Sequence, residues 1–233
     1  FHRILLVDHM VRTVGSNLPV RYNQAMSRPR FENLDPSKQR LLMDAAAAEF
    51  GTRGFEGASL NRILEVAGIS KSSLYYYFDD KADLFRTLLE KSLLKMQDEI
   101  GPFDPLDLDR SSFWPECERF YGKCVDMLGR DEWFVRLGRM FYQFQNSQSL
   151  AESAEEMFSI ARQWAKVLLE HGQALGQVRT DLPIDLLVTC TLGLAQALDE
   201  WVFLNWEKIE GKDRKEMTSS HIGMFRRLLY PEN

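Results

Sequence analysis

From Asp35 to the C-terminus the apolar residues recur at helical spacing, and this pattern restricts the fold more than any other feature. Leu42, Ala45, Ala46 and Phe50 follow one another every one to four residues, which places them on one face of a helix. We find no alternating strand pattern and no internal repeat in the sequence. The sequence therefore predicts an all-α protein, built from amphipathic helices with short connections.

Capping residues and helix breakers predict where these helices begin and end. N-cap residues stand at four expected starts: Asp35, which is followed by Pro36, then Ser59, Ser70 and Asp80. Gly54 and Gly68 are the predicted ends of the first two helices. After a loop rich in Pro and Asp, helices are predicted over 112–129, 131–146, 149–176, 184–207 and 214–229.

Charge is distributed unevenly along the chain. The whole sequence has a net charge of −5, but residues 1–91 carry 13 Lys and Arg against 11 Asp and Glu, whereas residues 92–233 carry 16 against 23. Phosphate binding needs only a locally basic surface, so the acidic total does not exclude a nucleic acid partner.

The sequence carries no sign of catalysis, of a metal or cofactor site, or of a membrane span. The four histidines show no metal-ligand spacing, and we find no phosphate loop, nucleophile elbow or HExxH motif. The longest uncharged apolar run, Leu186 to Leu198, is shorter than the roughly 20 residues that cross a bilayer. Cys117, Cys124 and Cys190 form no paired framework, which favours a reducing compartment. We expect a cytoplasmic protein that is not an enzyme and needs no cofactor, metal or membrane.

The segment 59–81, SLNRILEVAGISKSSLYYYFDDK, predicts a helix-turn-helix. Its apolar anchors hold two short helices around the turn at Gly68; they are Ile63, Ala67, Ile69, Leu74 and Phe78. Residues 66–78 contain no acid, so no carboxylate would be repelled by phosphate. A solvated helical hairpin is the alternative, but three consecutive tyrosines are a poor choice for a face that serves solubility alone.

Residues 40–85 resemble the N-terminal DNA-binding domain of the TetR family. The resemblance rests on the end of the first helix (Phe50, Gly54, Phe55), the AGIS turn over residues 67–70, the recognition helix KSSLYYYF and the lysine at 81. The departures from the family pattern are Ala58-Ser59 for Thr-Thr, Leu64 for Ala, Tyr77 for His, and Asp79-Asp80 for Pro-Ser.

The resemblance implies roles for individual residues on a double-stranded DNA operator. Ser59, Tyr75 and Lys81 would contact phosphate, and Tyr77 would contact phosphate or sugar. Lys71, Ser72, Ser73 and Tyr76 would face base edges in the major groove. Arg21, Arg28 and Arg30 are either an arm into the minor groove or a solvated tail.

The resemblance also implies the domain organisation. We expect a disordered extension over 1–33, a helix-turn-helix domain over 34–80, and a larger helical regulatory and dimerisation domain over 81–233. Positions 184–206 are apolar on nearly every side, which suggests core on one face and a partner subunit on the other. The residues expected in this homodimer interface are Leu194, Leu198, Trp201, Val202, Phe225 and Leu228.

A pocket for a small, largely apolar or aromatic effector is implied between the middle helices. Its expected lining is Phe120, Cys124, Trp133, Leu137, Phe141, Phe144, Trp164, Leu168 and Gln196. Further polar anchors would come from Arg136, Arg139 or Gln143, and ordinary core packing is the alternative for most of these residues. Cys117 and Cys124 are seven residues apart and share a helix face. The two interpretations of this pair are a thiol switch and inert buried thiols.

The leading hypothesis is a ligand-responsive repressor of transcription. Two alternatives stay open: a similar DNA-binding regulator that is controlled by a protein partner, and a helical interaction module without DNA binding.

Overall fold

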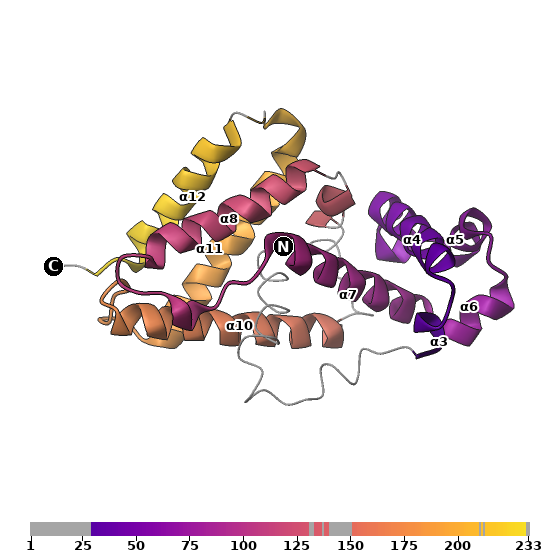
Figure 1. Cartoon of the computed structure of the whole chain (residues 1–233), viewed down its shortest axis with the longest axis horizontal. Helices are drawn as coiled ribbons and strands as arrows, with labels where there is room; N and C mark the ends of the chain where they lie inside the picture. The colour runs from indigo at the N-terminus through magenta and orange to yellow at the C-terminus, as the bar shows by residue number, and fades with distance from the viewer. Residues whose placement is uncertain are drawn as a thin grey trace.

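The computed structural model describes residues 29–130, 133–136, 138–139, 151–209, 211 and 213–231, and every regular element within them is a helix. Figure 1 shows α4, α5 and α6 gathered at one end and α8, α10, α11 and α12 at the other, with α7 leading from one group to the other. The prediction of an all-α protein is confirmed.

The N-terminal group contains α3 (Pro29–Glu32), α4 (Pro36–Gly57), α5 (Leu60–Ala67) and α6 (Lys71–Tyr77). The Asp35 carboxylate caps α4 as predicted, since Oδ1 accepts a hydrogen bond from the Ser37 backbone N–H at 2.9 Å. This bonding, with the Ser37 hydroxyl as the largest contribution, lowers the pKa of Asp35. At Gly54 the helix is interrupted by a left-handed φ of 67°, and the chain then makes a further turn to Gly57.

The remaining helices are α7 (Lys81–Ile100), the short η1 (Pro105–Asp107), α8 (Phe113–Arg130), α10 (Ala151–Ala174), α11 (Ile184–Asn205), η3 (Trp206–Lys208) and α12 (Asp213–Leu229). Four of them, α8, α10, α11 and α12, agree within two residues at each end with the helices predicted over 112–129, 149–176, 184–207 and 214–229. The helix predicted to end at residue 207 ends as α11 at Asn205, and the chain continues in the tighter turn η3. Within the predicted helix 131–146, residues 133–136 and 138–139 are helical, and the others lie outside the described residues.

The segment expected to be a disordered extension, 1–33, differs from that expectation at its end. Residues 29–32 form α3, and Phe31 is fully buried, with ring centroids 5.0 Å from Phe78 and 6.2 Å from Tyr77. A single aromatic side chain that fills an apolar gap is enough to order the residues around it. Residues 1–28 lie outside the described residues.

The C-terminal group packs in pairs, α10 against α11 and α8 against α12, while α7 contacts both α4 and α8. By length and composition alone the stretch Ile184–Lys208 would also suffice to cross a membrane, and 44% of its most apolar window is buried inside the chain. Because a core helix passes the same test, this composition does not by itself indicate a membrane.

Candidate nucleic-acid interface and internal cavity

The turn between α5 and α6 positions the second helix of the predicted helix-turn-helix. Gly68 ends α5 in the left-handed conformation, with φ 63°, and the Ile69 N–H donates to the Leu64 carbonyl at 3.1 Å. Leu74 and Phe78, the predicted anchors of α6, are each 1% exposed. The opposite face of α6 is thereby turned away from the core.

Hydroxyl groups cluster at the first turn of α6. Ser70 is its N-cap as predicted, because its Oγ accepts from the Ser73 backbone N–H at 3.1 Å. The same oxygen lies 3.0 Å from the Ser72 hydroxyl and 2.8 Å from the Ser73 hydroxyl. Lys71 and Ser72 are exposed, whereas Ser73 is half-buried.

The three tyrosines of α6 have different surroundings. Tyr75 and Tyr76 are 50% and 56% exposed, which is unusual for such large rings. Tyr77 is half-buried and meets Tyr76 and Phe31 edge-on. Arg30, one of the residues considered for a minor-groove arm, lies with Cζ 4.9 Å from the centre of the Tyr76 ring. Arg21 and Arg28 lie outside the described residues.

Ser59 begins α5, but its side chain makes no capping hydrogen bond, in contrast to the predicted cap. Its backbone N–H instead donates to Glu49 Oε1 at 2.9 Å, and Arg53 and Arg62 lie 3.5 Å and 3.8 Å from the same carboxylate oxygen. Glu49 is 9% exposed and so ties α4 to the start of α5. The sequence offered a signal for it, since position 49 falls on the same helix face as Leu42 and Ala45.

The Lys81 side chain is directed toward the end of α4. Its ammonium donates to the backbone carbonyls of Glu56 and Ala58, at 3.1 Å and 3.4 Å, and lies 4.7 Å from the centre of the Phe55 ring. These contacts satisfy carbonyls at the end of α4 and fix the start of α7 beside it.

The predicted cap of α7 is confirmed. The Asp83 N–H donates to Asp80 Oδ1 at 2.8 Å, and Asp83 Oδ2 accepts from the Asp79 N–H at 3.0 Å. Together with Lys81, these bonds give α7 a fixed origin next to the recognition helix.

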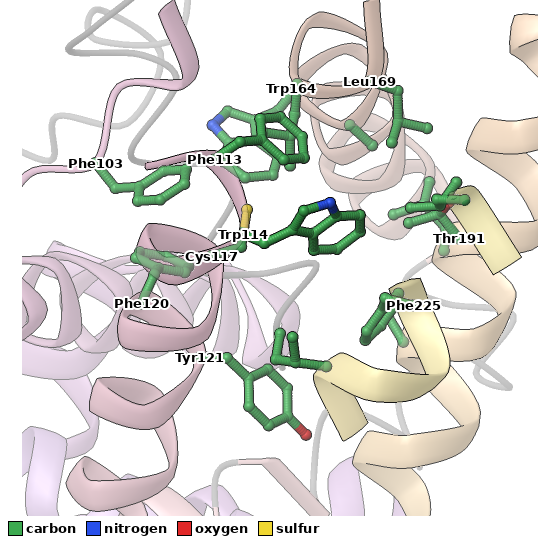
Figure 2. A pocket seen from close by; sticks show the side chains of 16 residues that line it. Phe103, Phe113, Trp114, Cys117, Phe120, Tyr121, Trp164, Leu169, Thr191 and Phe225 are labelled. Atoms are coloured by element: carbon green, nitrogen blue, oxygen red, sulfur yellow. The ribbon is translucent and has the colours of Figure 1, made fainter. Parts of the chain in front are cut away.

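A cavity of about 110 Å³ lies in the C-terminal group. Side chains of α8, α10, α11 and α12 line it together with Phe103, and ten of them are labelled in Figure 2. The lining is Phe103, Phe113, Trp114, Cys117, Phe120, Tyr121, Trp164, Ala165, Leu168, Leu169, Thr191, Leu192, Ala195, Ile222, Phe225 and Leu229. Among the residues the structure describes, no three or more His, Cys, Asp or Glu are grouped to hold a metal ion.

Three residues of the expected pocket, Phe120, Trp164 and Leu168, line this cavity. Cys124 is fully buried and Gln196 half-buried, but neither is part of the lining. The other expected residues lie elsewhere: Trp133 borders a separate cleft beside α4 and α7, and Leu137, Phe141, Phe144 and Gln143 fall outside the described residues.

The two arginines considered as polar anchors also lie away from the cavity lining. Arg136 is exposed, and Arg139 is bound through Nε to the Phe203 carbonyl at 3.0 Å and through a terminal nitrogen to Glu207 at 2.5 Å.

Sequence reasoning missed the aromatic residues at the start of α8, Phe113 and Trp114, which are central to the cavity. Their adjacency at the beginning of an aromatic-rich helix was the available signal. Tyr121, on the same helix, contacts His221 Nδ1 at 2.5 Å through its hydroxyl oxygen. Burial, reinforced by the negative charge of Asp199, raises the pKa of Tyr121 well above its usual value, so this hydroxyl is neutral at physiological pH.

Comparison with known proteins identifies the N-terminal domain. Residues 42–88 match the family model of bacterial regulatory proteins, tetR family. The HTH-type transcriptional repressor SCO4008 of Streptomyces coelicolor is 37% identical over 68 residues, 29% of this chain and 35% of that protein. The HTH-type transcriptional repressor AcnR of Corynebacterium glutamicum is 26% identical over 153 residues, 66% of this chain and 74% of that protein. Residues 42–88 therefore form a DNA-binding domain of the TetR family.

Solved TetR-like structures share the fold over about four-fifths of this chain. The SmeT–triclosan complex superposes with a TM-score of 0.65 and 18% identity, covering 84% of this chain and 92% of that one. The regulator FadR of Bacillus subtilis in complex with stearoyl-CoA gives 0.61 and 16% identity, covering 80% and 96%. At these identities the likeness concerns the fold alone, and the alignment with SCO4008 spans about a third of that repressor.

The predicted dimer residues occupy four different environments. Leu198 and Val202 are 9% and 3% exposed and belong to the core of the subunit, and Phe225 lines the cavity. Leu194 and Leu228 are half-buried, and Trp201 is exposed. Because α11 is apolar on nearly every side, its sequence did not reveal which residues face outward.

The outward face of α11 is a stripe with helical spacing. We call it the α11 stripe; its members are all exposed, and they are Leu186, Cys190, Gly193, Ala197, Trp201 and Leu204. The side chains at its centre, Cys190, Gly193 and Ala197, are small, and those at its ends are large.

Proposed function

We propose that this chain represses transcription by binding a DNA operator as a homodimer, and that a small, largely apolar effector releases it. The observation that carries the proposal is the outward face of α6. It presents Lys71, Ser72, Tyr75 and Tyr76 to solvent without any acid in residues 66–78. The matching family model and relatives that are named repressors support the same function.

The exposure of each residue refines the roles that we propose at the operator. Lys71, Ser72 and Tyr76 reach base edges, and the Tyr75 hydroxyl donates to phosphate. Ser73 and Tyr77 are half-buried and orient their neighbours as well as contact DNA. Ser59 keeps its hydroxyl for phosphate, since no hydrogen bond from that group is found among the described residues.

Lys81 acts at the operator mainly through the protein. Its ammonium already donates to two carbonyls at the end of α4. It would therefore attract phosphate by its charge, without a direct hydrogen bond. We therefore expect Lys81→Ala to weaken operator binding through a misplaced α7 as well as through lost charge.

The cavity supports a small-molecule effector rather than control by a protein partner alone, because a collapsed or filled centre would have left no room for a ligand. Two solved structures with this fold are complexes, one with triclosan and one with stearoyl-CoA. In this chain the cavity wall follows directly on α7: Phe103 lies three residues beyond its end, and Lys123 of α8 donates to the Ile100 carbonyl at 2.7 Å. Ligand binding would shift the population between DNA-competent and released spacings of the two recognition helices.

The α11 stripe supports homodimerisation with a second copy of this chain. Small residues at its centre allow two such helices to approach closely, and its large apolar ends are otherwise left in water. Two-fold symmetry also matches the paired half-sites that helix-turn-helix proteins read. A protein that binds chromosomal DNA in this way would be cytoplasmic.

Fluorescence anisotropy with DNA that flanks the chain's own gene tests the proposal. We expect saturable binding that unrelated DNA of equal length does not match, and a decrease of about ten- to a hundredfold in affinity for Lys71→Ala. Tyr75→Phe should weaken binding evenly across sequences, by a factor of about five. Lys215→Ala, an exposed lysine on α12, is the matched control and should bind as the wild type does.

The proposal is contradicted if flanking and unrelated DNA bind with equal affinity at every salt concentration and Lys71→Ala has no effect. That result would favour a helical interaction module that does not recognise an operator.

A further inference from the structure

An arginine outside the helix-turn-helix lies over the recognition helix. Arg30 belongs to α3, which contacts α6 and lies beside it in Figure 1. Its Cζ is 4.9 Å from the centre of the Tyr76 ring, inside the roughly 6 Å of a cation–π contact. Both side chains are exposed, Tyr76 to 56%. The pair is therefore part of the same outward surface as the other exposed residues of α6.

Two anchors in α3 hold Arg30 in this position. The next residue, Phe31, is fully buried, and its ring meets Tyr77 edge-on with the centroids 6.2 Å apart. The carboxylate of Glu32 lies 2.8 Å from the Lys91 ammonium on α7. Because α3 is tied to α6 and α7 in this way, the guanidinium has little backbone freedom to lose when it binds a further partner.

The positive charge of Arg30 is not neutralised by an acid among the residues that the structure describes. Glu32, two residues further on, is paired with Lys91 instead, and no ion pair of Arg30 is found in the described part of the chain. A guanidinium that stacks through its flat face keeps the N–H donors at its edge, and these suit a phosphate oxygen. Arg30 thus adds a cation to the acid-free surface of residues 66–78.

The contact also restrains the Tyr76 ring. An exposed side chain samples several rotamers and loses that freedom when it binds. Here Arg30 lies over the ring, and Tyr77 meets it edge-on with the centroids 5.2 Å apart. With two neighbours the ring is oriented before DNA arrives, so its hydroxyl reaches a base edge at a lower cost in entropy.

We propose that Arg30 and Tyr76 act as one unit in operator binding: the guanidinium holds the tyrosine ring in place, and its N–H edge binds a backbone phosphate. Arg30 is then a positioning residue for Tyr76 and a phosphate contact of its own, rather than an arm into the minor groove. The inference rests on the proposed function, because it concerns how the operator is bound, but the stack itself forms without DNA.

A double-mutant cycle of operator affinity, measured by fluorescence anisotropy on the full chain, tests this unit. We expect Arg30→Ala to weaken binding about tenfold in the wild type but only about two- to threefold in Tyr76→Leu, which has no ring to stack on. In Tyr76→Phe, which keeps the ring and loses the hydroxyl, Arg30→Ala should again weaken binding about tenfold.

The salt dependence of binding tests the phosphate contact. Arg30→Ala should lower the slope of log affinity against log salt concentration by about one, because one fewer phosphate is neutralised. Arg30→Lys keeps the charge and should keep this slope, although it loses the flat face and the fork of donors.

The stack is also measurable without DNA, by NMR of protein labelled at its arginines. Side-chain protons that lie over the face of an aromatic ring are shielded by its ring current. The Arg30 signals, identified by their absence in Arg30→Ala, should therefore move to lower field in Tyr76→Leu and stay in place in Tyr76→Phe.

Arg110→Ala is the matched control. It removes an exposed arginine from the loop before α8, so it changes the net charge equally and should keep the wild-type affinity and salt slope. Since Arg30, Tyr76 and Arg110 are all exposed, every variant should show the wild-type circular dichroism spectrum.

Three results would overturn the inference: Arg30 signals that do not move in Tyr76→Leu, a salt slope that Arg30→Ala leaves unchanged, or an equal loss of affinity for Arg30→Ala in the wild type and in Tyr76→Leu. The last would assign Arg30 to a separate contact, as a minor-groove arm would make. Equal binding of flanking and unrelated DNA would contradict the proposed function, whereas the NMR signals and the salt slope on unrelated DNA still judge the Arg30–Tyr76 unit. The two failures are therefore distinguishable.

Discussion

At the residue scale, Phe31 supports helix α6 although it does not belong to the helix-turn-helix. Its buried ring packs against Phe78 and Tyr77 at the end of α6, and Lys91 of α7 lies above it, with Nζ 5.4 Å from the ring centre. The same ammonium is 2.8 Å from Glu32. These contacts connect α3, α6 and α7, so the recognition helix depends on a residue that precedes its own domain.

We expect Phe31→Ala to lower the free energy of unfolding by about 3–5 kcal/mol, because it removes a fully buried ring and leaves a cavity. Operator affinity should fall as well, since α6 loses one wall. Urea unfolding and anisotropy measure the two effects, and Phe31→Leu should restore most of both. Leu106→Ala, at an exposed position, should change stability by about 0.5 kcal/mol or less. An unchanged unfolding midpoint for Phe31→Ala would show that α3 does not hold the recognition helix.

Cys117 is a second residue whose surroundings determine its chemistry. Burial raises the pKa of its thiol to about 12, an effect that Arg226 partly opposes. Burial also raises the pKa of Cys124 on the same helix. Both thiols are therefore protonated at physiological pH, which favours inert cysteines over the thiol switch that their shared helix face allows.

The raised pKa of Cys117 makes stability depend on pH in the alkaline range. The unfolded thiol ionises near pH 8.5, so between about pH 8.5 and 12 the folded chain holds a proton that the unfolded chain has lost. The contribution of this thiol to stability is complete below that window and is lost as pH rises through it. Urea unfolding from pH 8 to 10.5 should show a steeper loss for the wild type than for Cys117→Ala. Parallel curves would contradict the raised pKa, and rapid alkylation of native Cys117 at pH 8 would do so independently.

At the element scale, most helix ends were predictable, whereas the buried and exposed faces of some helices were not. Asp35, Ser70, Asp80 and Gly68 act through hydrogen bonds and φ angles within a few residues, so the local sequence contains the information. The burial of Phe31 depends instead on Phe78, a contact that no local pattern reveals.

The same reasoning explains the candidate sites. The residues of α6 were predictable because the anchors Leu74 and Phe78 fix its orientation and a family pattern covers it. In α11 apolar residues surround the helix, so nothing in the sequence distinguished buried Val202 from exposed Trp201. The cavity brings together α8, α10, α11 and α12, and such long-range packing cannot be derived from the spacing within any one of them.

Helix α7 is the element that connects the helices around the cavity to the helix-turn-helix. Its first turn is fixed by Asp80 and Lys81, and its last carbonyl, at Ile100, is held by Lys123 of α8. Lys123→Met keeps the aliphatic chain and removes this bond. It should lower the free energy of unfolding by about 1 kcal/mol and accelerate amide exchange around residues 98–104.

A matched lysine tests whether this effect is specific to the end of α7. Lys166→Met removes an ion pair on the surface of α10, 3.3 Å from Asp185, and should leave exchange at residues 98–104 as in the wild type. Equal exchange rates in the wild type and Lys123→Met would mean that Lys123 does not fix the end of α7.

At the scale of the whole molecule, the proposed function makes operator binding and dimerisation one property. On that proposal a single copy of α6 would read one half-site, and a two-fold dimer would place the second copy at the spacing of the other half-site. The α11 stripe lies in the C-terminal group, at the opposite end of α7 from α6 (Figure 1). A change on this stripe should therefore affect DNA binding without touching the helix-turn-helix.

Ala197→Glu places a carboxylate in the small-residue centre of the stripe, where a dimer would bury two of them close together. We expect the dimer dissociation constant in sedimentation equilibrium to rise at least about a hundredfold, which corresponds to roughly 3 kcal/mol, and operator affinity to fall with it. The monomer should keep its helical circular dichroism spectrum, because the core and the cavity lie within one subunit. Ala174→Glu, at the exposed end of α10, should leave the dimer intact. If Ala197→Glu dimerises as tightly as the wild type does, the subunits meet through another face, and the exposed apolar side of α11 requires a different partner.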